Sequence, residues 1–327
     1  MGSVFENLDR PYLSLLNDVP LPPLIFIMGD HRSGTTLLYK ILGATGCFNI
    51  VTAYHVIRQN EILFHHVHGS TEDGQRELCK IFERKGLSTR IFDGVAVASD
   101  MPEEYGFVLK DAGLRPQLTP EKAGDLIIFS KKLQLLCGKD RPLLLKNPWD
   151  YFLNFIQVKE IFPHSKFIFI GRHPIVTINS QLKAARSLFK DKNEYVALVA
   201  QWYEQLYKNP LRLQMSRALF SQHFDLGFHM VFRHVVRASH YFLKQITRLP
   251  DQEVLKIKYE DLCQEPKFTV DKTLSTLKLV ARTEPDYHDL IQPRAIELLP
   301  EVKRNQAKVS IKLKRYLAYW KYEENYE

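Results

Sequence analysis

Short apolar runs alternate with stretches of helical periodicity along most of the chain. Continuous apolar runs of this length are typical of strands that are buried on both faces of a sheet. The expected strands span residues 24–28, 143–145, 167–170 and, with more alternation, 253–259. The helical patterns that follow them cover residues 37–42, 151–162, about 174–188 and a stretch from about 268. This alternation predicts an α/β fold with a mostly parallel central sheet and helices on both faces.

The pattern shows no convincing domain boundary, so we expect a single domain over residues 1–327. Residues 1–20 are expected to form an irregular leader that ends in a proline cluster. Two helix-rich segments, 56–138 and 192–249, interrupt the alternation of strands and helices. We interpret them as insertions that form a lid or a side wall at one end of the sheet.

A glycine-rich turn joins the first expected strand to its helix. Its sequence is Gly-Asp-His-Arg-Ser-Gly-Thr-Thr over residues 29–36. Such a turn directs backbone N–H groups and the positive end of the helix at one point, which favours phosphate binding. The spacing of Gly29 and Gly34 matches the start of a nucleotide P-loop, but Thr35 stands where that loop has lysine. Arg32 supplies the positive charge instead.

A second basic position follows the strand at 167–170. Arg172 offers a planar fork of donors for a phosphate, and Ser180 lies eight positions further along the expected helix. Lys and Arg exceed Asp and Glu by 45 to 37, which gives a net charge of +8. The positive residues are scattered along the chain, so the excess fits a multiply phosphorylated small molecule or a solvated surface better than nucleic acid.

These residues resemble the motifs of the sulfotransferases that use 3′-phosphoadenosine-5′-phosphosulfate (PAPS). Residues 32–36 resemble the 5′-phosphosulfate loop, and Arg172 with Ser180 has the spacing of the family's 3′-phosphate pair. Leu-Leu-Lys-Asn-Pro at 144–148 resembles the strand-end lysine motif, and Tyr-Glu-Asp-Leu at 259–262 resembles a late-strand signature. The resemblance implies that the donor is bound by Arg32, Ser33, Gly34, Thr35, Thr36, Arg172 and Ser180. It implies that Lys146 neutralises the leaving oxygen.

The general base is less clear from the resemblance. In the cytosolic small-molecule branch a histidine follows the strand-end lysine by two residues, and Pro148 stands there in this chain. The loop with arginine is closer to the bacterial and tyrosyl-protein branches, which keep their base after the first helix. His55 is therefore our first candidate, because an ordinary histidine pKa of about 6.5 suits proton uptake near neutrality. Glu103 or Glu104, in an acidic motif at 101–105, is the second.

The resemblance implies in-line transfer of a sulfuryl group from PAPS to a hydroxyl or amine, without a metal ion and with 3′-phosphoadenosine-5′-phosphate (PAP) as the product. We expect a small metabolite as acceptor, with a carbohydrate or a peptide tyrosine as alternatives, bound by the helix-rich insertions. The family's C-terminal phosphate clamp is not recognisable, and Lys303, Arg304 or Lys308 is expected to replace it. A P-loop kinase or NTPase and a non-catalytic nucleotide-binding protein remain rival interpretations.

The remaining features concern the compartment. Four cysteines lie far apart without a CxxC pair, which is typical of reduced thiols. Residues 1–17 lack the apolar core of a signal peptide, and no apolar run has membrane-spanning length. We therefore expect a cytoplasmic protein without a membrane or nucleic-acid partner.

Overall fold

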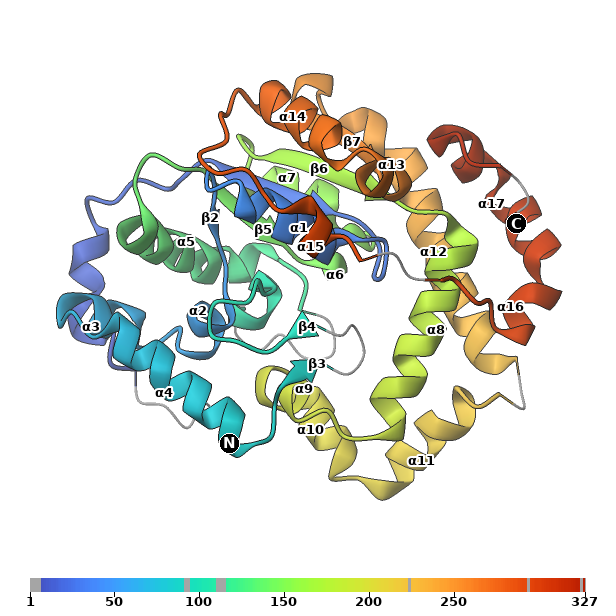
Figure 1. Ribbon diagram of the computed structural model, residues 1–327, viewed down its shortest axis with the longest axis horizontal. Helices are drawn as coiled ribbons and strands as arrows, with labels where there is room; N and C mark the ends of the chain where they lie inside the picture. The colour runs from blue at the N-terminus through green and yellow to red at the C-terminus, as the bar shows by residue number, and fades with distance from the viewer. Residues whose placement is uncertain are drawn as a thin grey trace.

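A computed structural model describes residues 7–90, 95–109, 116–222, 225–292, 295–323 and 326 (Figure 1). Its central sheet has five strands in the order β2-β5-β1-β6-β7, and every neighbouring pair is parallel. The strands are β1 (Leu24–Met28), β2 (Asn49–Ile50), β5 (Leu143–Lys146), β6 (Lys166–Gly171) and β7 (Val254–Lys258). The predicted parallel α/β fold is confirmed.

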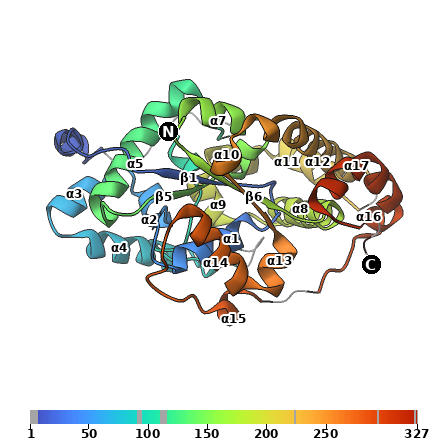
Figure 2. The same ribbon diagram turned by 90° about the horizontal axis from the view of Figure 1, so that it is seen from above.

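Alternate residues of the strands form two hydrophobic cores, because successive side chains of a strand point to opposite faces. Phe26, Leu145 and Phe167 belong to the core on one face, and Ile25 and Leu144 belong to the other. Helices α5 (Ala123–Cys137), α7 (Phe155–Ile161), α12 (Leu226–Gln245) and α17 (Gln306–Trp320) supply residues to the first core. Helices α1 (Thr35–Ala44), α13 (Tyr259–Gln264) and α14 (Pro266–Leu277) supply the second (Figure 2).

The other elements surround this framework. The remaining α-helices are α2 (Ala53–Ile57), α3 (Ile62–Val67), α4 (Thr71–Arg84), α6 (Pro148–Tyr151), α8 (Pro174–Lys190), α9 (Glu194–Val199), α10 (Gln201–Tyr207), α11 (Pro210–Leu219), α15 (Tyr287–Leu290) and α16 (Pro300–Arg304). Short 3-10 helices are η1 (Arg10–Leu16), η2 (Tyr105–Val108), η3 (Pro120–Lys122), η4 (Ile246–Arg248) and η5 (Asp251–Glu253). Strands β3 (Thr89–Arg90) and β4 (Val95–Ala96) pair antiparallel.

The helix predicted over residues 151–162 is interrupted. Helices α6 and α7 are separated at Leu153, whose φ of 60° lies in the left-handed region. The buried Asp150 carboxylate accepts hydrogen bonds from the backbone of Leu118 and from the side chain of Asn154, and this fixes the break. Gln117 Nε2 donates to the carbonyl oxygens of Trp149 and Phe152, which the interruption leaves without helical partners. The helix over residues 151–162 was predicted from the spacing of apolar residues, and this spacing carries no information about these polar contacts.

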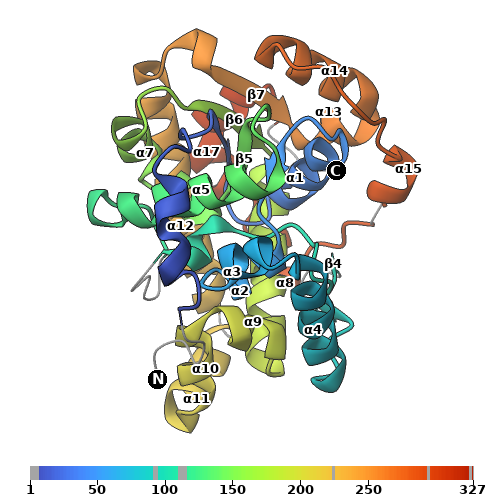
Figure 3. The same ribbon diagram turned by 90° about the vertical axis from the view of Figure 1, so that its left-hand side faces the viewer.

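The two helix-rich segments meet beyond the carboxyl ends of the strands. Figures 1 and 3 place α2, α4 and the group α9–α11 on the same side of the sheet. Tyr195 of α9 donates a hydrogen bond of 2.5 Å to Glu103, which joins the two segments. Within the described ranges, no helix is both long enough and apolar enough to cross a membrane.

Candidate active site

The central strands bring three sequence motifs to one edge of the sheet. β1 lies between β5 and β6, and all three run in the same direction. β1 leads into the glycine-rich loop, β5 ends at Lys146, and β6 leads into Arg172. Ligands of open α/β sheets bind outside the carboxyl ends of the strands, at such an edge. The parallel topology therefore assembles the loop, the lysine and the arginine from distant parts of the chain.

The loop after β1 folds tightly around its own backbone. The N–H of Ser33 donates to the carbonyl of Asp30 at 3.1 Å. Gly34 has a φ of 101°, and a Cβ at this position would lie 2.2 Å from the Tyr259 ring. Arg32 also has a left-handed φ, of 68°. This conformation requires glycine at position 34 and leads the chain into α1, where the unpaired N–H groups of the first helical turn favour an anion.

Arg32, Arg172 and Ser180 lie together beside the loop. Arg32 Nε donates to Ser180 Oγ at 3.1 Å, and Arg172 Nη1 donates to the Arg32 carbonyl oxygen at 3.2 Å. The Arg172 guanidinium also lies 4.0 Å from the centre of the Tyr259 ring, at cation–π distance. The Arg172 guanidinium thus lies against the backbone of the loop, and the Arg32 side chain lies against the Ser180 hydroxyl; fork-shaped donors and a hydroxyl are groups suited to binding a phosphate.

Lys146 links the loop to the acidic motif. Its side chain is 1% exposed, and its Nζ donates to Thr36 Oγ1 at 3.1 Å. The same Nζ pairs with Glu104 Oε1 at 2.9 Å. A buried ammonium held between a loop hydroxyl and a carboxylate can meet negative charge that develops next to the loop.

The neighbouring acids Glu103 and Glu104 occupy different environments. Glu103 is buried, and its carboxylate accepts hydrogen bonds from the backbone N–H of Glu104 at 2.9 Å and from Tyr195. The backbone of Glu104 is extended, so the two side chains point in different directions. Glu104 therefore contacts Lys146, while Glu103 joins the two helix-rich segments.

His55 lies in the cap of α2. Its Nδ1 accepts from the backbone N–H of Thr52 at 3.2 Å, and the Thr52 hydroxyl accepts from the backbone N–H of His55. These reciprocal bonds form a capping box. Burial lowers the pKa of His55 to about 4. Its ring also contacts the Tyr54 ring, with 5.7 Å between centroids, so the contacts of His55 are those of a helix cap.

Two histidines near the loop escaped sequence analysis. His31 lies in the loop itself, with its ring edge-on to Trp149 at a centroid distance of 4.7 Å. His234 of α12 pairs with Asp30 of the loop at 3.1 Å and stacks on Phe152. His31 sits within a recognisable phosphate loop, and that position was the signal that could have drawn attention to it.

The C-terminal candidates for a phosphate clamp are dispersed. Arg304 pairs with Asp225, and Lys308 lies 5.7 Å from the centre of the Phe232 ring. Lys303 lines a cavity of about 510 Å³ together with residues 295–298, Gln306 and Tyr326. Tyr326 contacts His173, which directly follows Arg172, so this cavity lies near the strand end of β6.

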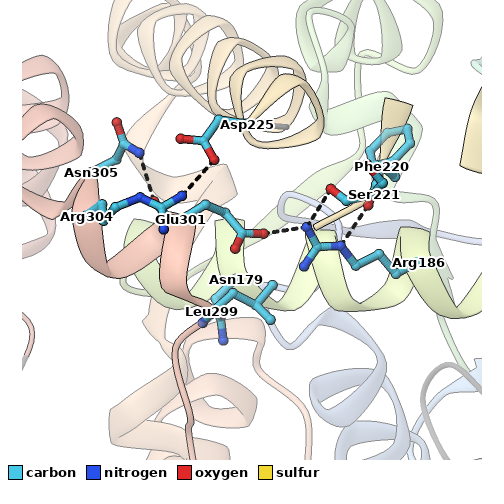
Figure 4. A network of polar contacts seen from close by, with 9 residues as sticks. All are labelled: Asn179, Arg186, Phe220, Ser221, Asp225, Leu299, Glu301, Arg304 and Asn305. Atoms are coloured by element: carbon cyan, nitrogen blue, oxygen red, sulfur yellow. Dashed lines mark hydrogen bonds and ion pairs between the residues drawn. The ribbon is translucent and has the colours of Figure 1, made fainter. Parts of the chain in front are cut away.

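A polar network anchors the helix that carries Ser180 (Figure 4). Arg186 of α8 pairs with the buried Glu301 of α16 and donates to the carbonyl oxygens of Phe220 and Ser221. Asn179, next to Ser180, accepts from the backbone N–H of Leu299 at 2.8 Å. The network fixes α8 to the C-terminal segment and so holds Ser180 in place beside the loop.

Among the residues that the structure describes, no group of three or more His, Cys, Asp or Glu side chains is placed to hold a metal ion.

Comparison with known proteins identifies a family and a fold for this chain. The model of the sulfotransferase family matches residues 23–234. Sulfotransferase STF9 from Mycobacterium avium is 14% identical, with 96% of this chain and 81% of that chain covered at a TM-score of 0.67. Sulfotransferase STF1 from Mycobacterium tuberculosis H37Rv is also 14% identical, with 95% and 80% covered at a TM-score of 0.55.

At this identity the two structures show a shared fold. A search of curated protein sequences gave no significant match. The family model spans well over half of the 327 residues and covers the loop, Lys146, Arg172 and Ser180. The chain therefore belongs to the sulfotransferase family.

Proposed function

We propose that this sulfotransferase takes its sulfuryl group from PAPS and binds the donor across the loop after β1. The observation that carries the proposal is the cluster of Arg32, Arg172 and Ser180 beside the loop. PAPS has phosphate groups at both ends of its ribose, so it needs two anion sites close together. The loop and the start of α1 supply one, and Arg172 with Ser180 supplies the other.

The proposed roles of the donor-binding residues follow from their charges. Backbone N–H groups of Gly34 and Thr35 and the hydroxyl of Thr36 bind the 5′-phosphosulfate. Arg32 lies between the two anion sites and neutralises the sulfuryl oxygens. The cavity that Lys303 lines would extend the binding region towards the donor's 3′ side.

Lys146 has a role in the transfer itself. As the acceptor attacks sulfur, the bond from sulfur to the phosphate oxygen breaks, and its electron pair stays on that oxygen. The Lys146 ammonium, held beside Thr36, stabilises the charge that develops there. Its pairing with Glu104 orients the ammonium before the donor arrives. We therefore propose Glu104 as a positioning residue for Lys146 and Glu103 as a link between the helix-rich segments.

We propose a small-molecule hydroxyl or amine as the acceptor, with a carbohydrate hydroxyl or a peptide tyrosine as alternatives. The helix-rich segments adjoin the transfer site through Glu103, Glu104 and Tyr195, and they supply its acceptor side. A screen of these three acceptor classes with PAPS, read by mass spectrometry for the gain of one sulfuryl group, distinguishes them.

The donor is tested by thermal denaturation with PAP and with ATP. PAP at 100 times its dissociation constant adds about 2.7 kcal/mol of apparent stability. For a chain of 327 residues this corresponds to a rise in Tm of about 4 °C. ATP lacks the 3′-phosphate that Arg172 and Ser180 are proposed to hold, so its shift should be much smaller. Equal shifts from the two nucleotides would contradict the proposal.

A further inference from the structure

His31 lies where the loop after β1 meets the strand-end segment of β5. Its ring is edge-on to Trp149, which follows Lys146 by three residues. The next residue after His31 is Arg32, so the imidazole stands between the two segments that hold the cations of the transfer site. Both segments are rigidly placed, because β1 and β5 are paired neighbours in the sheet.

The backbone of His31 is held on both sides. Its N–H donates to Asp30 Oδ1 at 2.8 Å, and its carbonyl oxygen accepts from Gln181 Nε2 at 2.8 Å. Gln181 follows Ser180 on α8, so the same helix positions the proposed 3′-phosphate hydroxyl and the His31 backbone. The imidazole is therefore fixed relative to the donor site rather than carried on a free loop.

The Nε2 atom of His31 is buried and has no hydrogen-bond partner among the described residues. A buried polar atom without a partner is destabilising, and a bound molecule that satisfies it would remove this cost. Other candidate bases are already engaged: the Glu104 carboxylate pairs with Lys146, and the Nδ1 of His55 accepts within a helix cap. The lone pair or N–H at His31 Nε2 is thus left for a molecule that enters the site.

The electrostatic surroundings keep this imidazole uncharged. Burial lowers the pKa of His31 and outweighs the opposing effect of the Glu104 and Asp30 carboxylates. The positive charge of Lys146 and the neighbouring His234 act in the same direction as burial. A neutral imidazole is the form that can accept a proton.

We propose that His31 is the general base of the transfer, with Nε2 as the atom that accepts the proton of the acceptor. The proposal rests on the proposed binding of PAPS across the loop after β1. The acceptor oxygen forms its bond to sulfur as its O–H proton moves to His31. The bond from sulfur to the phosphate oxygen breaks, its electron pair leaves with PAP, and the imidazolium returns its proton to solvent after product release.

The kinetic test uses radiolabelled PAPS with phenol and with 4-nitrophenol as acceptors. The His31→Ala variant should lose about 10²–10⁴ in kcat with phenol, and its Kd for PAP should stay within about threefold of the wild-type value. The loss should be much smaller with 4-nitrophenol above neutral pH, because that acceptor is already largely ionised. Added imidazole should restore part of the rate with phenol. The His55→Gln variant is the matched control and should keep its turnover.

If His31 had a merely structural role, His31→Ala would lower the rates with phenol and with 4-nitrophenol equally, and imidazole would not restore them. That pattern would overturn the proposal. A measurement without any acceptor is ¹⁵N NMR of His31 in the PAP complex near pH 7. We expect a neutral ring, and an imidazolium would overturn the assignment. Loss of PAP binding by the wild-type protein would overturn the proposed donor itself. PAP binding with normal turnover in His31→Ala would overturn only the role of His31.

Discussion

Replacement of His55 by glutamine separates a structural histidine from a catalytic one. Glutamine at the third position of a helix can form the reciprocal bond of a capping box, so the cap of α2 should be retained. Glutamine does not titrate. The variant therefore removes the protonation of His55 while it preserves the contact that the ring makes with Thr52.

The size of the pH effect on stability follows from the pKa of His55, which is about 4 in the folded protein against the ordinary value of 6.5. Because the folded pKa is lowered, the unfolded chain binds the proton first as the pH falls below 6.5. Stability is therefore complete above about pH 6.5 and declines as the pH falls towards 4. Linkage gives a loss of about 2 kcal/mol at pH 5 relative to pH 7 from this one group.

The assay is urea unfolding of the wild type and of His55→Gln at pH 7, 6 and 5. The free energy of unfolding should fall with acidification by about 2 kcal/mol less in the variant than in the wild type. Other histidines are the same in both proteins, so their effects cancel. His66→Gln on the exposed side of α3 is the control and should follow the wild type. Equal pH dependence in wild type and His55→Gln would refute the burial argument. A loss of turnover in a folded His55→Gln protein would restore His55 as the base.

Two further predictions concern the charged residues of the site. Arg172→Ala should weaken PAP binding about 10- to 100-fold with little change in kcat at saturating PAPS, while Lys146→Ala should lower kcat by about 10²–10³. Initial rates measure the effect on kcat, and PAP titrations measure the effect on binding. A change confined to KM in Lys146→Ala would show that the roles proposed for Arg172 and Lys146 are wrong. Glu104→Gln should lower the free energy of unfolding of the donor-free enzyme by about 2 kcal/mol, because it removes the carboxylate partner of buried Lys146. Without the Glu104 carboxylate, Lys146 is available to PAP, so PAP should raise the Tm of this variant more than that of the wild type. A smaller rise in the variant would contradict the idea that Glu104 and PAP compete for Lys146.

The sequence was sufficient to predict the elements that have a continuous apolar run or a characteristic glycine spacing. Three buried strands and the glycine-rich loop follow from apolar runs and from Gly29 and Gly34, because burial on both faces leaves a strong local signal. β2 has two residues and gives no such signal. The interruption at Leu153 depends on the side chain of Asp150, which contacts residues distant in sequence.

The roles of individual site residues were harder to predict for the same reason. Glu103 and Glu104 are adjacent in sequence, and only the placement of Lys146 and Tyr195 distinguishes them. The capping role of His55 did have a local signal, since Thr52 precedes it by the three residues of a capping box. The position of His31 in the loop is visible in the sequence, but its surroundings are not, because Trp149 and Glu104 come from other elements.

We expect anion binding and stability to be coupled at the proposed donor site. Arg172 donates to the backbone carbonyl oxygen of Arg32, so the Arg172 guanidinium is fixed against the loop before any phosphate arrives. The Tyr259 ring contacts the Arg172 guanidinium and the Ser180 hydroxyl contacts the Arg32 guanidinium, and neither contact removes the positive charge. The pair Arg186–Glu301 anchors the helix that supplies Ser180, so this hydroxyl stays beside Arg32. Phosphate groups of the proposed donor would pair with these charges in the bound state only, and a ligand that binds only the folded protein stabilises it.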